Sequence, residues 1–452
     1  MQIQFLGATQ NVTGSKTLLT WQNKKILVDC GLYQGLKELR LRNWEDPVFN
    51  PQELHAVVLT HAHIDHSGYI PLLIKKGFRG KIYCTPGTLA LCQVLLPDAG
   101  YLQEEEARYA NQRKFSKHNP AEALFTLEDA LASLEQFETV ALHKEFNLCE
   151  GLSFQFKSAG HIIGAASAHF HFAEKTLVFS GDVGRFQDVV MNPPEAVTVA
   201  DYLVMESTYG NRKHPDEDPS LQLQLVAERT LKRGGVLVIP AFAVGRAQAI
   251  LHLLVTLRDE NKIPNVPIYL NSPMSQKATA IFCDHLGEHK LTAAQCKHLC
   301  DQVISIKSPE ESYALNEKTN PMIIVSASGM ATGGRVVHHI RAFGPDAKNT
   351  ILFVGFQAAG TRGEALLHGA DELKMHGEYY KIRAEVARID GLSAHADAAE
   401  LVRWAKEIQI APKKVFLLHG EPSAQDALRL RLSDQLGWKA IEIPKYKDTF
   451  QL

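Results

Sequence analysis

Six consecutive residues, His61-Ala62-His63-Ile64-Asp65-His66, place three imidazoles and one carboxylate just after an apolar run. That run, residues 56–59, predicts a buried strand, because four apolar residues in a row precede a polar segment. A regular strand points successive side chains to opposite faces, whereas a loop can turn several of them toward one point. Imidazole and carboxylate are both common zinc ligands. The stretch therefore predicts a metal-binding loop at the end of a strand.

The number of ligands in this stretch predicts two metal ions. A single zinc ion that keeps an open position takes about three protein ligands. Because the stretch already offers four, we expect one ion to be bound by one pair of residues and the second ion by the other pair. These pairs are His61 with His63, and Asp65 with His66.

Further ligands are expected where other predicted strands end. His161 follows the strand-like run 154–156, and His419 follows the run 414–418. Asp182 follows another such run and is expected to bridge the two ions. Asp29 is expected to accept a hydrogen bond from a ligand imidazole and so to orient it. Two ions about 3.5–4 Å apart activate water for attack on phosphorus or carbon, so the pattern specifies hydrolysis but not the bond.

Composition excludes several other classes of protein. The chain has 48 Lys and Arg against 50 Asp and Glu, so its net charge of −2 excludes a histone-like binder of nucleic acid. Its seven cysteines form no Cys-x-x-Cys pair, which argues against a disulfide framework or a thiolate zinc site and favours buried thiols in a reducing cytosol. We find no signal peptide at the N-terminus and no apolar run of the roughly 18 residues that a membrane span needs. These features predict a cytoplasmic protein that does not contact a membrane.

The pattern of predicted strands and helices changes along the chain. Residues 1–207 read as short strands with a largely helical stretch at 87–145. From residue 208 longer units follow, in which an apolar strand such as 235–240 precedes a helical stretch such as 246–258. Alternation of this kind predicts a parallel sheet. After a turn cluster at 360–363 the short strands return, so we expect an inserted domain within a split one.

These motifs together closely resemble the metallo-β-lactamase superfamily. The histidine-rich stretch matches the superfamily signature, and the single-ligand motifs are found as Gly160-His161, Gly181-Asp182 and Leu418-His419-Gly420. The inserted part resembles a β-CASP domain, which occurs in nucleic-acid-processing members. The resemblance implies an α/β fold, a split αββα sandwich with an inserted parallel α/β β-CASP domain. Its expected parts are residues 1–207, 208–368 and 369–452.

The β-CASP resemblance also implies catalytic residues. Its motifs are found at Glu206, His395 and His419, and a histidine at the last of these is typical of members that act on RNA rather than DNA. A carboxylate beside an imidazole fixes its tautomer and raises its pKa. We therefore expect Glu206 to support His395 as the proton donor to the leaving oxygen. Asp65 is expected to serve in catalysis as well as in metal binding.

A loop at 326–335 is a candidate phosphate site. It lies between a predicted strand and a predicted helix, where backbone N–H groups and hydroxyls can hold an anion, although glycine-rich loops there often serve geometry alone. The resemblance to β-CASP domains favours the phosphate role. Each of the two arginines in the candidate set could equally make a structural ion pair. The candidates for phosphate binding are Ser326, Ser328, Gly329, Ser393, Arg246 and Arg362.

The sequence thus predicts a phosphodiesterase with two zinc ions per chain that acts on RNA, expected to be single-stranded, in RNA processing or decay. Whether it cuts internally, from the 5′ end or in both ways stays open, and a homodimer is compatible with the sequence. Three alternatives are a DNA nuclease, an inactive RNA-processing scaffold and a small-molecule hydrolase. They are disfavoured by His419, by the complete ligand set and by the long insertion, respectively.

Overall fold

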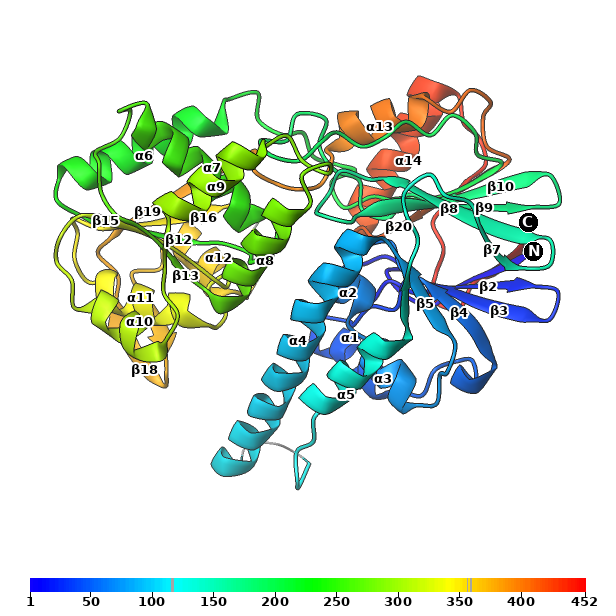
Figure 1. Cartoon of the computed structure of the whole chain (residues 1–452), viewed down its shortest axis with the longest axis horizontal. Coiled ribbons are helices and arrows are strands. Elements are labelled where there is room, and N and C mark those ends of the chain that lie inside the picture. The colour runs from blue at the N-terminus through cyan, green and yellow to red at the C-terminus, as the bar shows by residue number, and fades with distance from the viewer. Residues whose placement is uncertain (115–117, 356, 358–359) are drawn as a thin grey trace. The chain divides into compact units, whose positions relative to one another are not determined.

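The computed structural model describes residues 1–114, 118–355, 357 and 360–452, which form two compact units (Figure 1). The first unit comprises Met1–Phe186, Pro193–Lys213 and His395–Leu452. The second comprises Gln187–Asn192 and His214–Ala394. The polypeptide therefore leaves the first unit and later returns to it, as expected for a split domain with an insertion.

Two mixed sheets form the centre of the first unit, and each has seven strands among the described residues. The order in one sheet is β22 (Thr449–Gln451), β1 (Gln2–Phe5), β2 (Thr17–Trp21), β3 (Lys24–Val28), β4 (Leu54–Val58), β5 (Lys81–Cys84) and β6 (Phe137–Thr139). The order in the other is β21 (Ile441–Glu442), β20 (Lys414–Leu418), β11 (Tyr202–Glu206), β10 (Lys175–Phe179), β9 (Ala166–Phe172), β8 (Leu152–Ser158) and β7 (Phe146–Cys149).

Alternating side chains join these sheets to one another and to the helices outside them. Phe5 and Val58 pack with Phe170 and Val204 in a buried core that both sheets share. Leu203, the neighbour of Val204, points the other way because strand side chains alternate, and it packs under the outer helices. These helices are α13 (Ala398–Lys406) and α14 (Pro422–Leu436).

The opposite side of the first unit carries α1 (Lys37–Leu41), α2 (Ile64–Ser67), α3 (Ile70–Lys75), α4 (Pro86–Arg113) and α5 (Leu127–Ser133), as Figure 1 shows. The unit is thus an αββα sandwich. Within it, β11 pairs in parallel with both β10 and β20, and β3 pairs in parallel with β4. Parallel strands bring their carboxyl ends to one edge of a sheet, so the loops after these strands meet there.

The second unit is built on a parallel sheet that has six strands among the described residues. Their order is β14 (Ile304–Ser305), β13 (Ile268–Asn271), β15 (Met322–Ser326), β12 (Val236–Pro240), β16 (Thr350–Val354) and β19 (Glu385–Ile389). A separate hairpin contains β17 (Glu372–Met375) and β18 (Glu378–Lys381).

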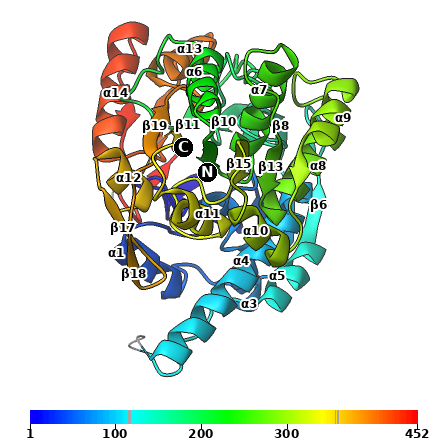
Figure 2. The same cartoon turned by 90° about the vertical axis from the view of Figure 1, so that its left-hand side faces the viewer.

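Helices cover both faces of this parallel sheet (Figure 2). Leu237 and Ile239 pack on one face with α6 (Pro219–Lys232) and α7 (Arg246–Asp259), and Val236 and Val238 pack on the other with α11 (Arg335–Phe343). The remaining helices are α8 (Pro273–Asp284), α9 (Ala293–Gln302), α10 (Pro309–Asn316) and α12 (Arg362–Leu367). No helix within the described ranges is long and apolar enough to cross a membrane.

The structure confirms the expected fold class, with two differences in detail. The stretch 87–145 contains α4 and α5 but also β6, because residues 137–139 complete the edge of a sheet. Residues 369–394 were expected with the C-terminal part of the sandwich. Instead they belong to the second unit, where β19 pairs in parallel with β16.

Candidate metal centre

The histidine-rich loop is held in place by backbone contacts from the loops before β2 and after β3. His63 ends the extended segment after β4, and α2 begins at the next residue. The Asp65 carbonyl accepts a hydrogen bond from the Ser15 amide at 2.8 Å. Gly31 packs so closely that a Cβ there would lie 1.6 Å from the Asp65 carbonyl oxygen. A side chain at position 31 would therefore displace the loop.

One group of donor atoms gathers around His63. Its Nδ1 lies 3.1 Å from Nε2 of His61 and 3.3 Å from Nε2 of His161. Oδ2 of Asp182 lies 3.4 Å from the same His61 nitrogen. All four residues place a donor atom within 4.8 Å of the others, so one ion could be bound by all of them.

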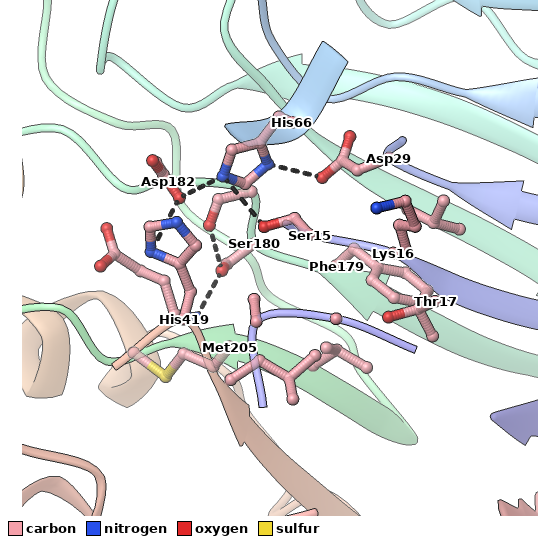
Figure 3. A pocket seen from close by; sticks show the side chains of 17 residues that line it. Ser15, Lys16, Thr17, Asp29, His66, Phe179, Ser180, Asp182, Met205 and His419 are labelled. Atoms are coloured by element: carbon pink, nitrogen blue, oxygen red, sulfur yellow. Dashed lines mark hydrogen bonds and ion pairs between the residues drawn. The ribbon is translucent and has the colours of Figure 1, made fainter. Parts of the chain in front are cut away.

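A second group lies on the other side of Asp182. His419 Nε2 is 3.2 Å from Asp65 Oδ2, and His66 places a ring nitrogen within 4.8 Å of both atoms. Asp182 presents Oδ1 to this group, 3.3 Å from His66 Nε2 (Figure 3). Its two oxygens thus face different groups, which is the arrangement of a bridging carboxylate.

The donor set fits a zinc site. Asp182 Oδ1 is buried and has no hydrogen-bond partner among the described residues. Ring nitrogens that face one another at 3.1 and 3.3 Å have the spacing of ligands around a tetrahedral zinc ion, whose bonds of about 2.0–2.1 Å give edges of about 3.3 Å. Both facts indicate donors that converge on a cation rather than on each other.

Burial prepares the first group for a metal. It lowers the pKa of His63 to about 3 and the pKa of His161 well below its usual range, with the neighbouring imidazoles acting in the same direction. Neutral imidazole is the form that binds metal ions, so these side chains need not lose a proton at neutral pH.

His66 is oriented from behind by Asp29. Its Nδ1 donates to Asp29 Oδ2 at 2.8 Å, and this leaves Nε2 to face Asp182 (Figure 3). Asp29 is itself held by the amide and hydroxyl of Thr60 at 2.8 and 2.9 Å. Burial opposes a charge on His66, but the carboxylates of Asp182 and Asp29 raise its pKa well above the usual range. The two carboxylates therefore favour the protonated, positively charged form of the His66 imidazole.

Glu206 and His395 form a pair beside the first group. Oε1 of Glu206 accepts from His395 Nδ1 at 3.1 Å and from the Val183 amide at 2.7 Å. The His395 ring lies 4.5 Å from the ring of His161, centroid to centroid. Glu206 is 1% exposed and His395 20%, so only the imidazole reaches the surface. Burial opposes its protonated form, but the charge and hydrogen bond of Glu206 raise the pKa of His395 to about 9.

Sequence reasoning missed three hydroxyl side chains at this site. Thr60 holds Asp29, Ser15 lies 3.3 Å from His66 Nε2, and Thr208 lies 2.9 Å from His419 Nδ1. Thr60 directly precedes His61 and Thr208 lies two residues after Glu206, and this closeness in the chain was the available signal. Ser15 had none, because it comes from a different loop.

The six candidate phosphate residues all belong to the second unit, whereas the metal-site residues belong to the first. Several are engaged within the fold. The Ser326 hydroxyl donates to the Asn271 carbonyl at 2.8 Å, and Arg362 donates to the Thr332 carbonyl at 2.8 Å. Arg246 donates to the Val354 carbonyl at 3.2 Å.

The rest of the set lies in the loop after β15 and near the end of the unit. The Ser328 hydroxyl accepts from the Thr332 amide at 3.1 Å, Gly329 packs against Phe242, and Ser393 is buried. Phosphate binding stays a prediction for all six residues.

Comparison with known families agrees with this geometry. A model of a "Beta-lactamase superfamily domain" matches residues 24–233, and a model of the "Beta-Casp domain" matches residues 247–366. A model described as "Zn-dependent metallo-hydrolase RNA specificity domain" matches residues 379–442. The three matches together span the loops that carry the donor atoms.

Several curated proteins are similar over almost the whole chain. Ribonuclease TTHA0252 of Thermus thermophilus is 34% identical over 429 residues, with 93% of each chain covered. The RNase J-like protein of Methanocaldococcus jannaschii is 31% identical, with 98% of this chain and 97% of the relative covered. Transcription termination factor FttA of Methanosarcina mazei is 34% identical, with 94% of this chain and 67% of the relative covered.

A solved structure supports the fold alone. It is a protein of unknown function from Enterococcus faecalis V583, 13% identical, with a TM-score of 0.56 over 100% of this chain and 99% of that chain. With the family models and the curated relatives, the buried histidine and aspartate groups lead to one assignment: the chain belongs to the β-CASP family of metallo-β-lactamase-fold, metal-dependent hydrolases.

Proposed function

We propose that this protein is a ribonuclease that binds two zinc ions per chain and cuts the phosphodiester bonds of single-stranded RNA. The observation that carries the proposal is the pairing of two donor groups through Asp182, with the Glu206–His395 pair beside them. The names of the relatives point to the same substrate, since one is a ribonuclease and another is RNase J-like. The RNA specificity model at residues 379–442 supports it as well.

The proposed ligands are the donors described above. His61, His63 and His161 would hold one ion, Asp65, His66 and His419 would hold the other, and Asp182 would bridge them. Bound there, the ions would activate a water molecule and offset negative charge on the phosphate. Asp29 would keep His66 in the tautomer that binds metal.

We assign the role of general acid to His395. Glu206 holds Nδ1, which leaves Nε2 to give its proton to the leaving oxygen as the P–O bond breaks. The Val183 amide holds Glu206 in turn, so the carboxylate does not swing away from the imidazole. The six candidate residues of the second unit stay proposed phosphate-binding residues. A cytoplasmic location and a homodimer stay predictions.

The direct test uses end-labelled single-stranded RNA and DNA of the same sequence with zinc-loaded protein. We expect cleavage of RNA, little cleavage of DNA and no hydrolysis of a chromogenic β-lactam. The lengths of the RNA products will also distinguish internal cutting from exonucleolytic removal. Equal rates on DNA, or efficient lactam hydrolysis with RNA left intact, would overturn the proposal.

The zinc count is tested separately by elemental analysis of protein purified without a chelator. We expect close to two ions per chain. In Asp182→Ala, zinc and cleavage should be lost together, because the bridging carboxylate serves both ions. A wild-type protein that holds one ion even after zinc addition would contradict the bridging role.

A further inference from the structure

Three of the seven cysteines gather where α8 meets α9 in the second unit. Cys283 lies in the last turn of α8, and Cys296 and Cys300 lie four residues apart on α9. The sulfur atoms of Cys283 and Cys300 are 3.9 Å apart. The Cys283 thiol lies 3.8 Å from the Cys296 carbonyl and can donate a weak hydrogen bond to it. The cluster belongs to neither the metal centre nor the candidate phosphate residues.

The segment between the helices holds the two thiols in this position. The His289 ring stacks on Phe282 at 3.9 Å, and its Nε2 lies 2.8 Å from the Phe282 carbonyl. The next residue, Lys290, donates its amide to the Val190 carbonyl at 2.8 Å. Thr292 then caps the start of α9 through a reciprocal pair of bonds with Gln295. Neighbouring bonds therefore keep the end of α8 beside α9.

The thiols differ in their access to solvent. Cys300 is exposed, Cys283 is half-buried, and Cys296 is 3% exposed. An oxidant in solution is therefore expected to react first with the Cys300 thiol, and the Cys283 thiol lies beside it. An S–S bond is about 2.05 Å long, so the two sulfurs must approach by roughly 1.9 Å from their present separation. The arrangement has the parts of a reactive thiol and a resolving thiol.

We propose that Cys283 and Cys300 are a redox modification site, at which a hydroperoxide converts the two thiols into a reversible disulfide. The exposed Cys300 sulfur attacks the peroxide oxygen, so that an S–O bond forms, the O–O bond breaks, and Cys300 becomes a sulfenic acid. The Cys283 sulfur then attacks the Cys300 sulfur, and the S–O bond breaks with release of water. Two thiols and one hydrogen peroxide thus give one disulfide and two waters.

The disulfide would join two helices of the same unit near their connection. Since α8 follows directly after β13 and contacts α7 through Gln248 and Thr279, the bond would tie the outer helix α9 to this layer. Whether such a pair is oxidised depends on its reduction potential against that of its surroundings, and we expect it to close when peroxide rises. Burial, together with the neighbouring cysteines, raises the pKa of the Cys283 thiol, and this limits its spontaneous oxidation.

The test treats the full-length, zinc-loaded protein with hydrogen peroxide, blocks the remaining thiols with an alkylating reagent, and maps cysteines by mass spectrometry. We expect the loss of two free thiols per chain, a cross-linked peptide containing Cys283 and Cys300, and full recovery with dithiothreitol. Cys283→Ser should stop at the sulfenic acid of Cys300, which dimedone traps. Cys300→Ser should form no disulfide at this site and should leave the Cys283 thiol free for alkylation.

Cys296→Ser is the matched control, because it removes the third thiol of the cluster and should still form the disulfide. The proposal is overturned if oxidation leaves Cys283 alkylated, if Cys300 links two chains instead, or if Cys300 proceeds to sulfinic acid while Cys283 stays free. It is also overturned if Cys296→Ser abolishes the cross-link while the variant keeps the wild-type circular dichroism spectrum.

Discussion

At the scale of single residues, the proposed roles of metal binding and proton transfer fall to different side chains. Glu206 accepts hydrogen bonds from the Val183 amide and from His395, and His395 alone of this pair reaches the surface. Burial lowers the pKa of all three histidines of the first group and so favours their uncharged form. The Glu206 carboxylate instead raises the pKa of His395 and favours the charged form of that imidazole. Similar side chains thus acquire different tasks from their neighbours.

This separation predicts the behaviour of His395→Ala. The variant should keep its zinc and its affinity for RNA but lose about 10²–10⁴-fold in cleavage rate, the usual contribution of a positioned general acid. Glu206→Gln should lose less, and the double variant should be little worse than His395→Ala, because residues that act as a unit are not additive. Single-turnover rates and elemental analysis give both readouts.

An RNA substrate with a sulfur leaving group is the control for this role, since its leaving group needs no proton. It should restore much of the rate of His395→Ala. Loss of zinc in that variant would instead make His395 a ligand, and failure of the sulfur substrate to restore the rate would remove its role as acid.

Lys16 is a buried cation in the first unit and lines the same pocket as His66 and Asp182 (Figure 3). Its Nζ donates to the Gly31 carbonyl and lies 4.9 and 4.4 Å from the ring centroids of Tyr33 and Tyr69. Burial lowers its pKa from the usual 10.5 to about 8. Below pH 8 the ammonium is charged in both the folded and unfolded states, so the cost of burying it is fully present.

The lowered pKa predicts a pH-dependent difference between the wild type and Lys16→Met. Between about pH 8 and 10.5 the folded form loses its proton first, so the unfolded form binds more protons and the wild type gains stability as pH rises. Urea unfolding at a series of pH values should show the wild type gaining about 3 kcal/mol relative to the variant over this range. A difference that does not change with pH would mean that Lys16 keeps its ordinary pKa.

At the scale of elements, the proposed general acid His395 lies two residues before Asp397, the cap of α13. Asp397 caps this helix by accepting from the amides of Ala399 and Glu400, and the Glu400 carboxylate accepts from the Asp397 amide. The other Glu400 oxygen accepts from the Phe186 amide at 2.9 Å. The cap therefore joins α13 to the loop after β10. The capping residue Asp397 lies two residues after His395.

Loss of this cap should affect both stability and catalysis. We expect Asp397→Ala to lower the free energy of unfolding by about 1 kcal/mol, and Asp397→Asn to lower it less because it keeps a side-chain acceptor. The cleavage rate should fall in the same order, since His395 would be held less firmly. Chemical denaturation and initial rates are the measurements. Equal effects of the two substitutions would show that the cap itself is not responsible.

At the scale of the whole molecule, the metal donors belong to one unit only. All seven proposed ligands lie in the first unit, and the described part of the second unit has its own buried cores on both faces of its sheet. Ligands that bind only the folded state stabilise it by mass action. Zinc should therefore stabilise the two units unequally.

Removal of zinc with a chelator should lower the melting temperature of the first unit and leave that of the second unchanged. At free zinc about 100 times the dissociation constant, each site contributes about 2.7 kcal/mol. Differential scanning calorimetry with and without chelator should resolve two transitions, of which one moves, and added zinc should restore it. A parallel shift of both transitions would indicate that the units unfold together.

The sequence by itself determined the local features of this protein. The strands around the core, such as 17–21 and 414–418, are predicted by alternating or continuous apolar residues. The residues from His61 to His66 are recognised as candidate metal ligands because three histidines and one aspartate stand in six residues of one loop. The helices after β12 and β15 follow from the same kind of reasoning. Each of these features depends on neighbours in the chain, so a local pattern is enough to predict it.

Only the tertiary structure decided which distant segments meet. Thr208 reaches His419 because β11 pairs with β20, and Ser15 reaches His66 because a separate loop packs against α2. The segment 385–389 has the pattern of a strand that would suit either unit, and its parallel pairing with β16 places it in the second. Strand partners are chosen by packing and hydrogen bonding between remote parts of the chain, and no local pattern records that choice.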